Sequence, residues 1–203
     1  MTAVPRPKLT PAEYLARERR AEFKSEYLNG ETFAMAGASY AHNLIKDNLV
    51  AELSTRLRGG PCRTLSSDMR VKVSRTGLYT YPDVLVLCGP PEFEDNERDT
   101  LLNPRVVIEV LSDSTEKYDR GAKFRHYQQV PSLQEYVLVS QDEPVVEHFA
   151  RRPDGTWVLT TTAGLDGELT LATVPARVPL AAVYAGVTFP DHPSGPPVNA
   201  GPR

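Results

Sequence analysis

Two apolar runs of this chain each contain a single carboxylate. The run TYPDVLVLC, residues 80–88, contains Asp83, and the run PRVVIEVLS, residues 104–112, contains Glu109. Both runs have the length and the β-branched content of buried strands. Because an unpaired carboxylate is unfavourable in an apolar core, each needs a cation, a hydrogen-bond donor or water beside it. The two runs therefore predict a β-sheet with a polar site built into it.

The segments around these runs predict both helices and strands. Thr10 caps an expected helix that ends near Ala21. Asn29-Gly30 separates two short β-like runs and predicts a hairpin, and apolar residues at three and four spacing predict an amphipathic helix over residues 39–58. The other expected elements are strands at residues 62–73, 79–88 and 106–111, a helix at 114–130, a strand at 134–139, and a β-rich segment with a turn at 153–155.

This order of elements indicates an α/β fold of the mixed α+β type. We expect a central mixed β-sheet flanked by helices, with an N-terminal hairpin and a C-terminal β-rich extension, and not a doubly wound parallel sheet. A length of 203 residues with 40% hydrophobic residues fits one domain. We expect that domain to span residues 1–189 and the Pro/Gly-rich residues 190–203 to form a disordered tail.

Charge and cysteine content exclude several classes of protein. The formal net charge of −3 gives no overall basic field, so any nucleic-acid site would have to be local. Cys62 and Cys88 have no metal-ligand spacing, and they argue against a disulfide framework and a structural zinc site. No apolar stretch has the length of a signal peptide or a membrane span. We therefore expect a cytoplasmic protein with reduced cysteines and no membrane partner.

Strand geometry predicts that the two carboxylates can meet. If the two runs form neighbouring strands, Asp83 and Glu109 can share one face of the sheet. A divalent cation between them, Mg²⁺ or Mn²⁺, would offset their mutual repulsion. Lys123 can reach the same place from the following helix, where Asp119 and Tyr127 lie four residues away on the same face. A metal ion with a positive side chain beside it serves phosphodiester hydrolysis.

These residues carry a resemblance to a known family. Pro82-Asp83 followed by Glu109 on the next strand resembles the PD-(D/E)xK nuclease superfamily. Over residues 12–189 the chain is similar to the Uma-two family of restriction-endonuclease-like proteins. The similar segments are YLARERRAEFKSEYLNGE, SSDMRV, YPDVLVLC, PRVVIEVLS, STEKYDRGAKFRHY and LQEYVLVSQ.

The resemblance implies an endonuclease that hydrolyses DNA phosphodiester bonds with Mg²⁺ or Mn²⁺. It implies that Asp83 and Glu109 are catalytic and hold the metal together with the backbone carbonyl of Val110. In the superfamily a lysine stands two positions beyond the glutamate, but here that position is Leu111, and the Uma-two family is similar in lacking the lysine. Lys123 would then supply the amine from the helix. A homodimer would suit the cleavage of two strands.

Three further residues are weaker candidates for the site. Glu26, in the expected hairpin, is a carboxylate that could complete it, but it could equally be a cross-strand surface charge. His42 lies near the start of the long helix, where a lone histidine is more often simply hydrogen-bonded. Asp68, in SSDMRV, is more typical of a turn or bulge.

Structural interpretations stay open for the main candidates as well. Asp83 can organise a strand entry, Glu109 can pair with a cation at the core edge, and Lys123 can be an exposed partner of Asp119. For the whole protein, the alternative is a catalytically inert module of nuclease fold that binds DNA or oligomerises. Basic residues that could contact phosphates, or simply form a solvated face, are Arg56, Arg58, Arg63, Arg70, Lys72 and Arg75.

Overall fold

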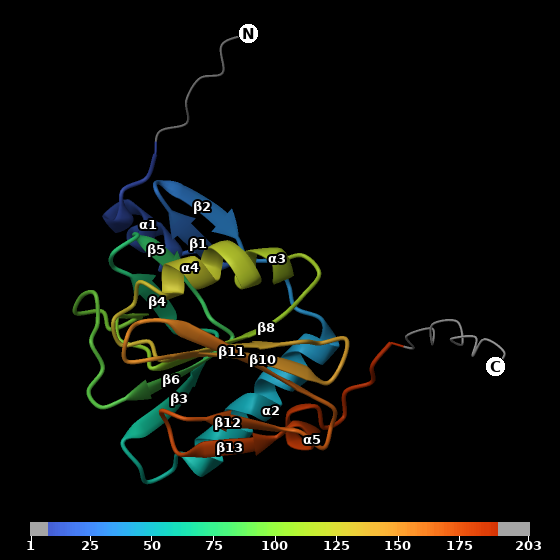
Figure 1. Ribbon diagram of the computed structural model, residues 1–203. Coiled ribbons are helices and arrows are strands. Elements are labelled where there is room, and N and C mark those ends of the chain that lie inside the picture. The colour runs from blue at the N-terminus through green and yellow to red at the C-terminus, as the bar shows by residue number, and fades with distance from the viewer. Residues whose placement is uncertain (1–7, 191–203) are drawn as a thin grey trace, which may run out of the picture.

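A computed structural model describes residues 8–190 of the chain, which form two larger β-sheets, a small one and a few helices (Figure 1). The helical elements are α1 (Pro11–Glu18), α2 (Tyr40–Arg56), α3 (Glu116–Tyr118), the π-helical turn η1 (Asp119–Lys123), α4 (Phe124–Tyr127) and α5 (Leu180–Val183). The five-stranded sheet has the order β2 (Glu31–Ala34), β1 (Ser25–Leu28), β5 (Leu78–Thr80), β4 (Arg70–Val73) and β7 (Thr100–Leu101). The six-stranded sheet has the order β11 (Trp157–Ala163), β10 (Val145–Arg151), β9 (Glu135–Val139), β8 (Val106–Val110), β6 (Val84–Cys88) and β3 (Cys62–Ser66). β12 (Glu168–Leu171) pairs with β13 (Ala176–Pro179).

The six-stranded sheet is central, and each of its faces is covered by a hydrophobic core. β8 runs parallel to β9, and the other pairs are antiparallel. On one face, Ile45, Leu49 and Leu53 of α2 pack against alternate residues of the strands together with the β12–β13 hairpin. On the other face, Phe124 and Tyr127 of α4 pack against the intervening residues. The expected mixed α+β class, with helices flanking a mixed sheet, is confirmed.

The hairpin and the long helix form where the sequence predicts them. Asn29 and Gly30 have φ values of 51° and 90°, the left-handed conformation that a tight two-residue hairpin turn requires. Ser39 caps α2 by accepting a hydrogen bond from the backbone N–H of His42. Both expectations are confirmed by these local geometries.

Two of the expected strands are each divided between the two large sheets. Residues 62–73 form β3 in the central sheet and β4 in the five-stranded sheet, and residues 79–88 form β5 and β6 in the same way. Treating each segment as one strand was therefore wrong. Apolar residues continue through both segments because both sheets bury them, so the pattern does not reveal where the chain crosses. Asp83 lies in the second crossing, directly before β6.

The two cysteines form a disulfide, which contradicts the sequence-based expectation. Cys62 on β3 and Cys88 on β6 are cross-strand partners, and they close a loop with a sequence separation of 26. Nothing in the spacing of two cysteines shows that their strands will be neighbours in that register. The pairing of β3 with β6 brings them together.

Removing this disulfide should lower the stability of the fold. In the chain-entropy account, a cross-link closing a loop of this size contributes about 3.5 kcal/mol by restricting the unfolded chain. We expect the double variant Cys62→Ala/Cys88→Ala to lose that amount in urea unfolding without reductant. Reductant should move the wild type towards the variant and leave the variant unchanged. Equal wild-type unfolding curves with and without reductant would contradict this expectation.

A buried carboxylate tethers the C-terminal hairpin to the central sheet. Glu135, fully buried on β9, accepts hydrogen bonds from the backbone N–H groups of Ala172 and Thr173 and pairs with Nε2 of His148 at 2.6 Å. Burial alone would raise the pKa of Glu135, but the hydrogen bonds from His148 and Thr173 outweigh it, and the pKa lies below its ordinary value of 4.5.

This lowered pKa predicts a stability contribution that depends on pH. A carboxyl with a depressed folded-state pKa stabilises the fold above its unfolded value, and the contribution disappears as pH falls through the folded value. Glu135→Gln should therefore cost about 1–3 kcal/mol in urea unfolding at pH 7, and less at a second pH below 4.5 at which both proteins still fold. Glu168→Gln, an exposed carboxylate on β12, is the matched control. An equal loss at both pH values for Glu135→Gln would exclude the ionised carboxylate as the cause.

No helix among residues 8–190 is long and apolar enough to cross a membrane. The expected tail at residues 190–203 lies outside the described residues except for its first position.

Candidate active site

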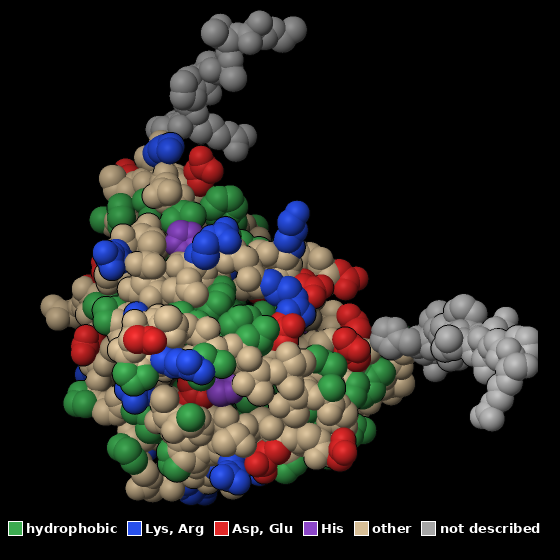
Figure 2. Space-filling view, in the orientation of Figure 1, with side chains coloured by type: hydrophobic (Ala, Val, Ile, Leu, Met, Phe, Trp, Pro, Cys, Tyr) green, Lys and Arg blue, Asp and Glu red, His purple; other side chains and the backbone are tan. Residues whose placement is uncertain are grey.

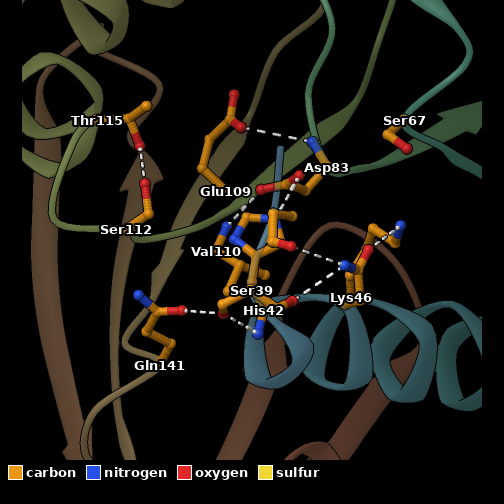
Figure 3. Close-up of polar contacts among 12 residues, drawn as sticks. Ser39, His42, Lys46, Ser67, Asp83, Glu109, Val110, Ser112, Thr115 and Gln141 are labelled. Atoms are coloured by element: carbon orange, nitrogen blue, oxygen red, sulfur yellow. Dashed lines mark hydrogen bonds and ion pairs between the residues drawn. The ribbon is translucent and has the colours of Figure 1, made fainter. Parts of the chain in front are cut away.

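Strand register places Asp83 opposite Glu109. Val84 of β6 faces Ile108 of β8 in an antiparallel pair, so one step along each chain brings Asp83 beside Glu109. The backbone N–H of Asp83 lies 3.4 Å from Oε2 of Glu109, and the backbone N–H of Val110 donates to Oδ2 of Asp83 at 2.8 Å (Figure 3). The sheet therefore holds the two carboxylates close together at the same end of β6 and β8.

Lys123 lies among three carboxylates. Its Nζ is 2.9 Å from Oε1 of Glu109, 3.3 Å from Oδ1 of Asp119 and 3.5 Å from Oε1 of Glu26. We call these four residues the Lys123 cluster. The side chain of Lys123 is only 7% exposed, so it is not a solvated surface lysine. It enters the site from the π-helical turn η1, and such turns are frequent at functional sites.

Carboxylates outnumber cations in this cluster, and the pKa values reflect this. Burial raises the pKa of Glu109 well above 4.5, and the nearby Asp119 and Asp83 add to the rise while Lys123 opposes it. Burial also raises the pKa of Asp119. Burial alone would lower the pKa of Lys123, but the charges of Glu109 and Asp119 outweigh it and raise the pKa well above 10.5. The buried carboxylates thus resist being ionised together, while the lysine between them is held protonated.

Glu26 belongs to this site and is not a surface charge of the hairpin. It is buried, and it accepts hydrogen bonds from the hydroxyl groups of Thr80 and Tyr118. Glu26 lies on β1, and its contact with Lys123 links the N-terminal hairpin to the helical segment that carries the lysine.

His42 contacts Asp83 on the side away from Val110. Its Nε2 lies 3.0 Å from Oδ1 of Asp83, so both oxygens of that carboxylate have a partner (Figure 3). Ser39 accepts from the backbone N–H of His42 and donates to Oε1 of Gln141 at 2.7 Å. The start of α2 therefore fixes the imidazole against the carboxylate. Within the described part of the chain, Nδ1 of His42 is buried without a hydrogen-bond partner.

Other residues singled out from the sequence lie elsewhere. Asp68 is exposed in the turn between β3 and β4 and pairs with Lys24, which lowers the pKa of that carboxyl. Arg70 is buried and binds Thr100, Tyr81 and Asp99 instead of facing solvent. Lys72 pairs with Glu94. The stretch of basic residues before β5 is thus not one continuous phosphate-binding face.

Asp119 and Tyr127 are members of the site that the sequence suggested only as neighbours of Lys123 on a helix. The hydroxyl group of Tyr127 donates to Oε1 of Glu109 at 3.2 Å, and burial raises its pKa well above 10. Nothing in the sequence singles out Tyr118, whose hydroxyl group donates to Oε2 of Glu26. For Asp119 and Tyr127, the one signal in the sequence is their four-residue spacing from Lys123.

Within residues 8–190, no three His, Cys, Asp or Glu side chains form a ready-made metal site. Two carboxylates are nevertheless enough for Mg²⁺, which keeps several water ligands and takes others from a substrate phosphate. Oδ1 of Asp119 is buried and lies 3.3 Å from Nζ of Lys123. The all-oxygen donors, and the presence of more carboxyl groups than cations, fit a hard divalent cation.

The mixed sheet with Asp83, Glu109 and a lysine brought in from a helix defines a protein of the restriction-endonuclease-like class. Comparison with known proteins is consistent with this class. The chain matches the Uma2 family, described as "Putative restriction endonuclease", over residues 11–182, and it belongs to that family.

Relatives and a solved structure extend the comparison. The chain is 37% identical over 187 residues to the uncharacterized protein slr1290 of Synechocystis sp., covering 92% of this chain and 97% of that protein. It is 40% identical over 161 residues to the uncharacterized protein sll1609 of the same organism, covering 79% and 91%. A crystal structure of a "putative nuclease belonging to DUF820" from Anabaena variabilis superimposes with a TM-score of 0.71 at 17% identity, covering 87% and 97%, which shows a common fold.

Proposed function

We propose that this protein is a metal-dependent endonuclease that hydrolyses phosphodiester bonds of DNA. The observation that carries the proposal is that Asp83 and Glu109 lie together at the end of two paired strands, with Nζ of Lys123 2.9 Å from Oε1 of Glu109. Membership of a nuclease-like family supports it. A homodimer, which would present one such site to each strand of a duplex, is part of the proposal.

Asp83 and Glu109 would hold Mg²⁺ or Mn²⁺, with the backbone carbonyl of Val110 as a further oxygen ligand. When bound, such an ion lowers the pKa of a coordinated water and polarises the phosphate. Lys123, fixed by Glu109 and Asp119, would offset the charge that develops on the phosphate oxygens. Tyr127 would hold the carboxylate of Glu109 in place through its hydroxyl group.

His42 is a positioning residue in this proposal, because it contacts Asp83 and not the reacting atoms. Loss of a group that orients a metal ligand typically costs about 10- to 100-fold in activity. We expect a decrease of that size in kcat for His42→Ala, with KM little changed. His42→Gln keeps a hydrogen-bond donor near Oδ1 and should recover part of the rate. Equal activities of the alanine and glutamine variants would exclude the positioning role.

A catalytically inert protein of nuclease fold, which binds DNA or oligomerises, is the second candidate. The specific observation in its favour is the buried Leu111 at the position where the superfamily has its lysine. In that case Lys123 would only neutralise buried carboxylates.

Nicking of supercoiled plasmid separates the two candidates. Wild-type protein is incubated with Mg²⁺, with Mn²⁺ and with chelator, and the Asp83→Asn variant is purified and assayed in parallel. Nicking that needs metal and is absent from the variant supports the endonuclease. Absence of nicking in every metal lane, or equal nicking by both proteins, would favour the inert module, and DNA binding and oligomeric state would then be measured.

A further inference from the structure

A pocket of about 490 Å³ shares no residue with the Lys123 cluster and has no carboxylate in its lining. It is formed where the turn between β4 and β5, the end of α4 and the β10–β11 hairpin meet. Its lining residues are Arg75, Gln128, Gln129, Pro131, Arg151, Gly155 and Trp157. Two guanidinium groups, two amides and an indole together suit a ligand that carries both negative charge and a flat ring.

The two arginines are free to meet an anion. Among residues 8–190, neither Arg75 nor Arg151 has a carboxylate within 4.0 Å. Arg75 is exposed in its turn. Arg151 is anchored by one nitrogen, Nη1, which donates to the backbone carbonyls of Val130 at 3.3 Å and Leu133 at 3.5 Å. The rest of its guanidinium group is held in place without being neutralised.

Trp157 supplies an aromatic surface beside these charges. The guanidinium carbon of Arg151 lies 5.7 Å from the centre of its ring, and Phe124 packs against it edge to face with ring centres 5.3 Å apart. The indole is therefore fixed in orientation, yet it remains partly exposed in the pocket. Stacking on a fixed aromatic ring, with arginine beside it, is how proteins hold bases of single-stranded nucleic acid.

The pocket and the candidate active site are connected by one helix. Lys123 precedes α4, and Gln128 follows it, roughly 8 Å further along the axis at about 1.5 Å per residue. A few nucleotides of one strand can span such a separation. The face in Figure 2, over α3, α4, β10 and β11, shows basic and acidic side chains interspersed, without a broad area of one charge. On this face, nucleic acid would therefore be bound by a local pocket and not by a broad basic groove.

We propose that this pocket binds a short single-stranded segment of nucleic acid, with a base against Trp157 and Arg151 and a phosphate at Arg75. The choice of nucleic acid as ligand rests on the proposed nuclease function. The pocket would hold the strand on one side of the cleavage site.

Trp157 is the only tryptophan of the chain, so its fluorescence reports this pocket directly. The full-length Asp83→Asn protein in chelator is titrated with oligothymidylate, with the same length of duplex, with dTMP and with inorganic phosphate. We expect saturable quenching by oligothymidylate at concentrations well below those needed for dTMP or phosphate, and weaker binding of the duplex. No quenching, or quenching by dTMP or phosphate at the same concentrations, would overturn the proposal.

Variants then locate the contacts, with binding followed by the anisotropy of a labelled oligothymidylate. Arg75→Gln should weaken binding several-fold and lower the slope of log affinity against log salt by about 0.7, the value for one phosphate contact on a single strand. Trp157→Leu should weaken binding by about 5- to 150-fold, the loss of one stacked base. Arg17→Gln removes the same charge from the exposed face of α1 and should change neither quantity. Equal effects of Arg75→Gln and Arg17→Gln would mean that binding depends only on the net charge of the protein, and this would overturn the proposal.

The outcome is separable from that of the nuclease test. Quenching without plasmid nicking would support nucleic-acid binding at the pocket and contradict the proposed nuclease activity. Metal-dependent nicking without a fluorescence response at Trp157 would support the nuclease activity and contradict binding at the pocket.

Discussion

Replacing Asp83 with asparagine should lower the rate of metal-dependent plasmid nicking by more than about 100-fold, since loss of a metal ligand exceeds the effect typical of the residues that orient one. Asparagine keeps the size of the side chain, and its carbonyl oxygen can still accept from the backbone N–H of Val110. What it removes is the negative charge. The folded structure should therefore persist while the metal site is lost, and circular dichroism and urea unfolding would check that it does.

The matched control is Asp47→Asn, which makes the same change on an exposed carboxylate of α2. The side chain of Asp47 is 73% exposed and its nearest ion-pair partner is Lys46 at 3.8 Å. We expect nicking by this variant to equal that of the wild type. An Asp83→Asn protein that folds and nicks at the wild-type rate would remove Asp83 from the site.

Replacing Lys123 with methionine should lower the free energy of unfolding by about 3–5 kcal/mol at neutral pH, the usual cost of removing one partner from a buried ion pair. Methionine fills a similar volume, so the loss is mainly electrostatic. Glu109 and Asp119, both almost fully buried, would be left without the cation that lies 2.9 and 3.3 Å from them. Urea unfolding of the purified proteins at pH 7 measures the difference.

Lys72→Met is the matched control for this change. Lys72 pairs with Glu94 at 2.7 Å, but both side chains are about one-fifth exposed, so water can replace the lost partner. We expect this control to cost about 1 kcal/mol or less. Similar losses for the two lysine variants would mean that Lys123 does not neutralise the buried carboxylates in the way the distances indicate.

Much of the fold can be predicted from local sequence patterns. The apolar spacing of α2, the Asn29-Gly30 turn and the two buried runs each predict one element, and the order of those elements predicts the class. The division of residues 62–73 and 79–88 between two sheets could not be predicted, because strand periodicity reports burial and not the identity of the sheet that provides it. The Cys62–Cys88 bond depends on strand register, which the spacing of two cysteines does not contain.

The residues of the candidate site also differ in how well the sequence predicts them. Asp83 and Glu109 stand out because a charge within an apolar run needs a partner, and both lie in the site. Glu26 and His42 were weak candidates because each comes from a distant segment whose place beside β6 and β8 is set by tertiary packing. Asp68 had equal standing in the sequence and lies outside the site, paired with Lys24.

The π-helical turn at η1 places a requirement on chain length in addition to residue type. Each residue of an α-helix turns the next by about 100°, so shortening the segment by one residue would rotate everything on one side of the deletion by that angle relative to the other. Lys123 would then leave the carboxylates, or Phe124 and Tyr127 would leave the sheet. The number of residues between Asp119 and Lys123, in addition to the identity of these two residues, is therefore what keeps the cluster assembled.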